Sequence, residues 1–411
     1  MARLTPLSKL LITVVVLGAV AAGIYTNRDS LQRLAPEAEP MRSNVPPVAT
    51  LPEDPSLLAP TATPGCPQLP EVRFYHWAWN AQAGMMLATG GKQAAEGSLM
   101  CKHGVNLKLV REDNTDQMQN LLAAFAEGLK RGEANPSGGA HFVGIMGDGS
   151  ANFLKGLNDR LLKLGKEYGA VVVGSAGYSR GEDKFMGPPA WKQNPQAARG
   201  GLVAGVLRDG DWNIALKWLG DNKIPNNPDE SSWDPDALNW VNAPDYVDAA
   251  QKYVSGFCAE LKSVKTGKAE KRCVDGVVTW TPGDVSVLKK KGGLVSVAST
   301  REYASQMPHV VIGIDRWMKD NRSIVEGLLE AMFDGGDQVK AVPASLRHAA
   351  GVSAAVYKEQ NADAAYWENY YHGMVEKDKQ GNTVELGGSA VNNLADNLQL
   401  FGLASDRKSV V

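Results

Sequence analysis

From residue 70 onward, short apolar stretches alternate with amphipathic segments along the chain. Each apolar stretch ends in polar turn residues, and apolar positions at helical spacing follow, as in 116–128. Strands that alternate with helices in this way predict parallel sheets covered by helices. We expect strands over 72–77, 107–110, 142–146, 170–173, 201–207, 274–279, 294–297 and 310–314.

The same pattern predicts helices, and the length of the chain predicts more than one lobe. A chain of 411 residues exceeds the usual size of a single hydrophobic core. We expect lobe 1 over 67–199 and 298–341, an inserted lobe 2 over 200–297, and a helical or irregular C-terminal extension over 342–411. The expected helices cover 84–99, 116–128, 152–164, 212–219, 244–261, 285–291 and 316–333, with a polar, proline-interrupted loop over 226–239.

The N-terminal region has a different pattern, with one unbroken apolar stretch over 10–25. As a helix this stretch is roughly 24 Å long, and Arg3 and Lys9 precede it. The positive flank predicts a signal anchor over 1–26 that places the rest of the chain outside the cytoplasm, in the periplasm of a bacterium. A signal cleaved after Ala21 and a buried core helix are the alternatives. The proline-rich segment 27–66 predicts an extended linker.

Charge and cysteine content narrow the function classes. The net charge is −2 and the basic residues are dispersed, which argues against a nucleic-acid partner. Four cysteines in an exported chain favour disulfides, paired Cys66–Cys101 and Cys258–Cys273, with free buried thiols as the alternative. Neither the cysteines nor the six histidines have metal-ligand spacing, so we expect no metal and no cofactor.

Polar residues gather in the turns that follow the predicted strands. In open parallel sheets the ligand lies beyond the carboxyl ends of the strands, facing helix N-termini. Each turn has a simpler interpretation as well: the tryptophans suit a core or its rim, and 147–150 suits a helix cap. Their convergence predicts a ligand site made of Trp77, Trp79, Asn80, Asp113, Asp148, Ser150, Tyr178, Asp211, Trp280 and Thr281.

Three stretches carry a resemblance to a known family. They are 74–80 (FYHWAWN), 102–110 (KHGVNLKLV) and 274–282 (VDGVVTWTP), the last followed by Leu288 and Gly292-Gly293. In these short motifs and in their order along the chain, the sequence resembles the type II periplasmic binding proteins of the nitrate, sulfonate and taurine kind. It is also similar to membrane-anchored binding-domain proteins that carry an OmpA-like domain, although the sequence shows no such domain.

The resemblance implies a cleft between two α/β lobes that closes on a small polar solute, for an ABC-type permease or for sensing. It implies chain crossovers near Gly200 and 297–303, and ligand contacts at Trp79, Asn80, Asp148, Ser150 and Trp280, with Asp113 nearby. Relatives of this kind hold oxyanions. The acidic turns here suit a cationic or zwitterionic ligand better, because carboxylates repel an anion. A scaffold that binds an envelope protein is the alternative.

The one enzyme motif is the segment 177–181, which matches the GxSxG nucleophile elbow around Ser179. The elbow needs a helix directly after the serine, and the sequence continues with the glycine- and proline-containing stretch 184–189 instead. Dinucleotide and Walker phosphate loops are absent. We therefore expect no enzyme and no catalytic residue, and a Ser179-dependent hydrolase is the weaker alternative.

Overall fold

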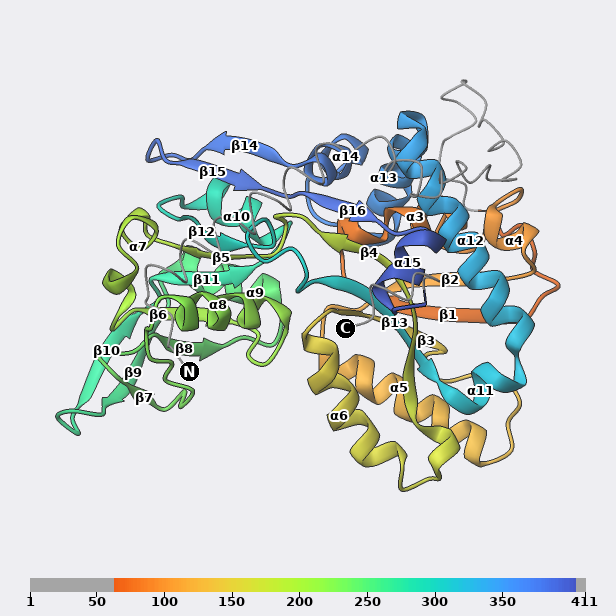
Figure 1. Ribbon diagram of the computed structural model, residues 1–411, viewed down its shortest axis with the longest axis horizontal. Helices are drawn as coiled ribbons and strands as arrows, with labels where there is room; N and C mark the ends of the chain where they lie inside the picture. The colour runs from red at the N-terminus through yellow and green to blue at the C-terminus, as the bar shows by residue number, and fades with distance from the viewer. Residues whose placement is uncertain (1–62, 404–411) are drawn as a thin grey trace, which may run out of the picture. The chain divides into compact units, whose positions relative to one another are not determined.

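The computed structural model describes residues 63–403, which form two main sheets (Figure 1). The strands of the larger sheet contain long apolar runs, and β3 is buried at every position because helices cover both faces of the sheet. The order of its six strands is β16 (Ser389–Val391), β4 (Ala170–Ser179), β13 (Pro308–Ile314), β3 (Phe142–Met146), β1 (Glu71–His76) and β2 (Asn106–Arg111).

Two layers of helices enclose the larger sheet. On one side lie α5 (Thr115–Lys130) and α6 (Gly149–Leu161), which contact each other and β3. On the other side lie α3 (Ala83–Thr89), α12 (Arg322–Ala341) and α13 (Pro343–Tyr357), with α4 (Leu99–Lys102) beside α12. Apolar positions at helical spacing in α5, such as Met118, Leu122 and Phe125, are fully buried against the sheet.

The smaller sheet has five strands and forms the second lobe. Its order is β12 (Val295–Ser299), β5 (Lys184–Gly187), β11 (Gly276–Thr279), β6 (Leu202–Gly205) and β8 (Asn239–Asn242). Its helices are α7 (Pro189–Gln193), α8 (Gly210–Asp221), α9 (Tyr246–Ser255) and α10 (Gly283–Lys290). A hairpin of β9 (Cys258–Ser263) and β10 (Ala269–Cys273) pairs with β7 (Ser232–Trp233) beside it.

The chain crosses between the two sheets twice, from β4 to β5 and from β12 back to β13. Side chains join these two crossings. The Ser179 and Thr300 hydroxyls lie 2.7 Å apart, and the Gly181 amide donates to the Thr300 hydroxyl at 2.6 Å. The Thr300 amide donates to the Asp183 carbonyl at 3.1 Å. The two connections therefore form one hydrogen-bonded unit.

The sheets are mixed where the sequence predicted mainly parallel ones. The pairs β1–β2, β1–β3, β11–β6 and β6–β8 are parallel. However, β13 runs antiparallel to both β3 and β4, and β5 runs antiparallel to both β11 and β12. The difference arises at the crossings, because β5 and β13 are the strands that receive the chain from the other lobe.

The expected strands are present, whereas β5 and the strands β7 to β10 were not expected, and several helix ends differ. The helix expected over 84–99 ends at Gly90, which has φ 70°, and the helix expected over 244–261 ends at Gly256, which has φ 69°. Both glycines adopt the left-handed conformation that terminates helices. The helix expected over 316–333 is divided into α11 (Asp315–Asp320) and α12.

The C-terminal region contains more strand than predicted. Beyond α13 come α14 (Ala364–His372), the hairpin of β14 (Met374–Lys377) and β15 (Thr383–Leu386), then β16 and α15 (Leu394–Leu400). β16 joins the six-stranded sheet beside β4. Similarly, β5 already belongs to the smaller sheet, before the crossover expected near Gly200. The lobe boundaries remain predictions.

Both predicted disulfides are confirmed. Cys66–Cys101 ties the start of the described chain to α4, and Cys258–Cys273 joins the first residue of β9 to the last of β10. The predicted anchor over 1–26 and most of the linker over 27–66 lie outside the described residues. Within 63–403, no helix has both the length and the apolar character needed to cross a membrane.

Candidate functional site

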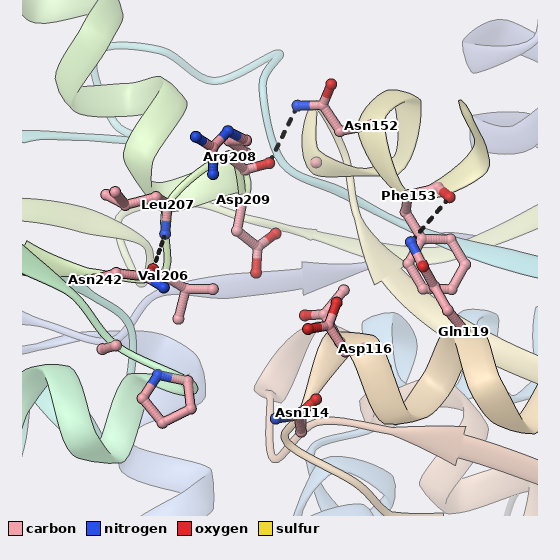
Figure 2. Close-up of a pocket in the computed structure, with 14 residues that line it drawn as sticks. Asn114, Asp116, Gln119, Asn152, Phe153, Val206, Leu207, Arg208, Asp209 and Asn242 are labelled. Atoms are coloured by element: carbon pink, nitrogen blue, oxygen red, sulfur yellow. Dashed lines mark hydrogen bonds between the residues drawn. The ribbon is translucent and has the colours of Figure 1, made fainter. Parts of the chain in front are cut away.

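A pocket of about 460 Å³ lies between the lobes, where α5 and α6 face the turns that follow β6 and β8 (Figure 2). Its lining is polar on both sides, and Asp116 and Asp209 point into it. The other lining residues are Asn114, Thr115, Gln119, Gly149, Asn152, Phe153, Val206, Leu207, Arg208, Asn242, Ala243 and Pro244.

The turn between β6 and α8 is held in an unusual backbone conformation. Arg208 has φ 68°, a left-handed value that a residue with a side chain adopts only at a cost. Hydrogen bonds from both lobes hold the turn. Asn152 Nδ2 donates to the Arg208 backbone carbonyl at 3.2 Å, and the Leu207 backbone amide donates to Asn242 Oδ1, also at 3.2 Å. Strain of this kind is concentrated at ligand sites. Here it places Asp209 at the inner end of the pocket.

Asp209 lies where the N-termini of α6 and α8 meet. Its carboxylate accepts a hydrogen bond from the Gly210 amide at 2.7 Å, at the start of α8. The same carboxylate touches Gly149, the first residue of α6, so closely that a Cβ at 149 would lie 2.5 Å from Asp209 Oδ1. Burial raises the pKa of Asp209 to about 6, and the hydrogen bond from Gly210 opposes this shift.

Two further carboxyls continue inward from Asp209. Asp211 and Asp183 are buried, and as carboxylates none of their four oxygens meets a donor in hydrogen-bond geometry in the described part of the chain. The two carboxyls lie close enough to share a proton when Asp211 is protonated. Burial raises the pKa of Asp183 to about 7. Burial also raises the pKa of Asp211 well above its usual value, and the charges of Asp183 and Asp209 add to this effect. We call Asp183, Asp209 and Asp211 the acidic trio.

The indole of Trp79 lies beside the trio. Its Nε1 is close to the Asp183 carboxyl without meeting hydrogen-bond geometry, and it has no other partner among residues 63–403. The Trp79 side chain is completely buried, and its ring centroid lies 5.5 Å from that of His309. A buried N–H donor and four carboxylate oxygens without partners are unusual together, since buried polar atoms are normally hydrogen-bonded.

A second group of charges, next to the trio, is fully paired. Lys184 and Asp284 form an ion pair between side chains that are both 0% exposed. The Thr281 hydroxyl donates to the same Asp284 oxygen at 3.1 Å. Glu182 accepts from Asn80 Nδ2 at 3.2 Å and from the Ser389 hydroxyl, and burial raises its pKa well above the usual value, assisted by the charge of Asp183.

Three aromatic side chains, Trp77, Trp280 and Tyr246, form a contact between the lobes. The ring centroids of Trp77 and Trp280 lie 5.8 Å apart, and the Tyr246 ring contacts that of Trp280 at 4.2 Å with its plane tilted by 41°. The Trp280 indole donates across the interface to the Ala78 carbonyl at 3.0 Å. The Trp77 indole donates to the Asp113 carbonyl at 3.2 Å. These contacts hold the lobes together at this point of the cleft.

The structure brings six of the predicted ligand residues into the buried interface between the lobes: Trp77, Trp79, Asn80, Asp211, Trp280 and Thr281. Three others lie nearer the surface. Asp113 pairs with Arg111 at 2.7 Å, Asp148 is exposed and accepts from Gln306 Nε2 at 3.1 Å, and Ser150 is partly buried in the first turn of α6. Tyr178 lines a different cavity. Their role as ligand contacts remains a prediction.

Sequence reasoning missed the residues that come from the crossing after β4. Glu182, Asp183 and Lys184 are all 0% exposed, yet they form a charged run that is typical of a surface loop. The available signal was their position, since the run directly follows the glycine-rich end of a buried strand. Asp116, Asn152, Arg208 and Asn242 were missed as well, because they line the pocket from helix and turn positions outside the predicted set.

Ser179 does not have the surroundings of a nucleophile. The segment 177–181 continues β4 and leads to β5, whereas the elbow requires a strand, a tight turn and a helix. The Ser179 hydroxyl is buried, contacts Thr300, and accepts a hydrogen bond from the Asp183 amide at 2.9 Å. The serine therefore joins the two crossings and positions Asp183. Within 63–403, no group of three or more His, Cys, Asp or Glu side chains is arranged to hold a metal.

Comparison with known proteins identifies the fold. The structure is similar to the periplasmic nitrate-binding protein NrtA from Synechocystis PCC 6803, with a TM-score of 0.55 and 11% identity over 80% of this chain and 77% of that one. The aliphatic sulphonate-binding protein SsuA from Escherichia coli matches with a TM-score of 0.46 and 14% identity over 72% of this chain and 80% of that one.

The alkanesulfonate-binding protein SsuA from Xanthomonas axonopodis pv. citri, bound to MOPS, has a TM-score of 0.45 and 14% identity over 75% of this chain and 83% of that one. No family model and no curated protein sequence matches the chain. The likeness to NrtA shows that the chain has the two-lobed fold of the type II periplasmic binding proteins, as the sequence resemblance implied.

Proposed function

We propose that this chain is an extracytoplasmic solute-binding protein that holds a small cationic or zwitterionic solute between its two lobes, for an ABC-type uptake system or for sensing. The observation that carries the proposal is the acidic trio. It starts at the interlobe pocket with Asp209 and ends at Asp183 with carboxylate oxygens that lack partners. The fold supports the same function, because its two lobes enclose a pocket lined from both sides.

The charge of the trio determines which solutes fit. An ammonium or guanidinium group in the pocket supplies N–H donors to Asp209. Its positive charge also favours ionisation of Asp211 and Asp183, which are buried next to Asp209 and do not line the pocket. An oxyanion in the same place would meet the negative charge of Asp209, whose pKa of about 6 leaves it ionised at pH 7, and would lose free energy. The nitrate and sulphonate ligands named for the structural neighbours are therefore not the ligands we expect here.

A thermal-shift screen tests the proposal. The purified protein is heated with putrescine, spermidine, arginine or glycine betaine, and in parallel with nitrate, sulfate and taurine. A ligand at a hundred times its Kd stabilises the folded state by about 2.7 kcal/mol, so binding raises the Tm clearly. We expect a rise with at least one of the cationic or zwitterionic amines and none with nitrate or sulfate.

Matched variants locate the ligand. Asp211→Asn removes one carboxylate of the trio, and we expect it to lose the Tm rise. Asp320→Asn removes a carboxylate whose side chain is 67% exposed and lies outside the pocket, so the rise should persist. A Tm rise with nitrate or sulfate, or a rise with an amine that survives Asp211→Asn, contradicts the proposed ligand class.

The tether and the compartment are part of the same proposal. Two disulfides suit the oxidising periplasm, and the apolar segment 10–25 suits an inner-membrane anchor. Full-length protein should sediment with membranes and resist extraction by alkaline carbonate, while a chain beginning at Thr63 behind a cleavable signal should stay in the soluble periplasmic fraction. Recovery of the full-length protein in the soluble fraction would contradict the anchor.

A scaffold in the cell envelope is the second candidate function. The observation that favours it is the direct contact between the lobes through Trp77, Trp280 and Ala78, which fills part of the cleft with protein. A scaffold of this kind predicts no Tm change with any solute. It also predicts crosslinks to an envelope protein from a photoreactive residue at Asn152, on the rim of the pocket.

A further inference from the structure

A second cavity, of about 800 Å³, lies beside the crossings and has a different lining from the interlobe pocket. Three of its side chains, Arg180, Arg301 and Lys340, are cationic, and no lining residue is acidic. The remaining lining residues are Tyr178, Thr300, Ala304, Tyr371, His372, Gly388, Ser389 and Ala390. The two cavities share no lining residue, so the interlobe pocket and this cavity are separate places on the molecule.

Two of the three cations of the cavity have acidic partners, and the third has none among the described residues. Arg301 pairs with Glu385 at 3.0 Å, and Lys340 pairs with Asp396. Arg180 has no ion pair in the described part of the chain, so within 63–403 one positive charge of the cavity has no acidic partner. An arginine presents several N–H donors in one plane, which matches the oxygens of a carboxylate or phosphate.

The cavity is built on fixed backbone. The Arg180 amide donates to the Gly388 carbonyl at 2.7 Å, which ties the crossing to β16. Gly181 has φ 119°, and a Cβ there would lie 2.7 Å from Arg301 Nε. Only glycine at 181 therefore lets the Arg301 side chain lie flat against the crossing. Tyr178 and Tyr371 add aromatic surface to the same cavity. The backbone from which the Arg180 side chain extends is thus fixed, and the Arg301 side chain lies against the crossing at Gly181.

We propose that this cavity is a second binding site, for a small anion that carries a carboxylate or phosphate group, with Arg180 as its principal contact and Arg301 and Lys340 in support. We call it the crossing site. It takes a ligand of opposite charge to the solute proposed for the interlobe pocket. The proposal does not depend on that solute, because no residue of the acidic trio lines the crossing site.

Isothermal titration at low ionic strength tests the crossing site, with citrate and pyrophosphate as probes for the two oxyanion groups. We expect at least one of them to bind the wild-type protein. Arg180→Gln should weaken binding at least tenfold, which corresponds to about 1.4 kcal/mol. Ala304→Glu, at an exposed lining position, should weaken it as well by placing a negative charge in the cavity. Citrate alone identifies a carboxylate ligand, and pyrophosphate alone a phosphate.

Two controls separate this site from other effects. Arg131→Gln removes an arginine whose side chain is 64% exposed and lies outside both cavities, so binding should be unchanged. Asp211→Asn should also leave anion binding intact, although it removes binding of a cation in the interlobe pocket. Failure of both probes to bind at about 1 mM, or an equal Kd in Arg180→Gln and Arg131→Gln, overturns the crossing site and leaves the proposed function untouched.

Discussion

Two pairs of buried charged residues lie side by side in this molecule and are arranged in opposite ways. Lys184 and Asp284 are completely buried and neutralise each other. The carboxyl of Asp183, the neighbour of Lys184 in the chain, is equally buried but faces the carboxyl of Asp211, another acid, and within 63–403 neither carboxyl meets a donor in hydrogen-bond geometry other than a proton shared between the two. The first pair is complete without a ligand. The second pair has no cation to balance it. For this reason we regard the first pair as a structural contact and the second as part of a candidate site.

The largest expected effect comes from breaking the complete pair. Lys184→Met leaves the Asp284 carboxylate buried without its cation, and removing one partner of a buried ion pair typically costs about 3–5 kcal/mol. We expect a loss of that size in the free energy of unfolding, measured by urea denaturation. Lys184→Met combined with Asp284→Leu should recover part of the loss, because no unpaired charge remains. A loss below about 1 kcal/mol in the single variant would show that the pair is solvated.

The pH dependence of stability sharpens the same contrast. In the folded state, burial raises the pKa of Asp183 to about 7 and the pKa of Asp209 to about 6. The ordinary pKa of an aspartate, which applies in the unfolded chain, is 3.8. Through these two groups the folded protein binds protons that the unfolded chain releases, so their contribution to stability falls as the pH rises from about 4 to about 7. The buried His76, His141 and His309, whose pKa is lowered to about 4, 3 and 3, act in the opposite sense below about pH 6.5. Each group contributes a slope of at most about 1.4 kcal/mol per pH unit.

Unfolding free energies at pH 5 and pH 8 check this dependence. Relative to the double variant Asp183→Asn with Asp211→Asn, in which the histidines are unchanged, the wild type should lose stability between pH 5 and pH 8. Asp320→Asn serves as the exposed control and should keep the wild-type slope. An equally steep slope in the double variant would mean that other groups, such as the buried Glu182, dominate the titration.

A smaller effect is expected at the serine that positions Asp183. Ser179→Ala removes the acceptor of the Asp183 amide and the partner of the Thr300 hydroxyl. Leaving buried polar groups without partners costs about 1–3 kcal/mol, so the free energy of unfolding should fall within that range. Esterase activity toward a nitrophenyl ester should be absent from both proteins. Activity that disappears in Ser179→Ala would restore the hydrolase interpretation.

The sequence predicted the architecture better than the site, for a physical reason. Strands such as β3 are buried on both faces and are therefore continuous apolar runs that can be recognised locally. The site depends on residues that the two crossings and both lobes bring together. Asp211 was found because it follows a strand of the second sheet. Asp183 was missed because a charged run such as 182–184 ordinarily lies at the surface, and only the packing of both lobes buries it.

The smallest expected effect completes the comparison with an exposed pair. Lys265 and Asp236 also form an ion pair, at 2.6 Å, but their side chains are 55% and 60% exposed. Water screens such a pair, and surface ion pairs typically contribute about 0–1 kcal/mol. Lys265→Met should therefore change the free energy of unfolding by less than about 1 kcal/mol, several times less than Lys184→Met. Equal losses in the two variants would show that burial does not set the value of these pairs. The inference that the unpaired acids Asp183 and Asp211 belong to a ligand site would then lose its support, since it also depends on the effect of burial on charges.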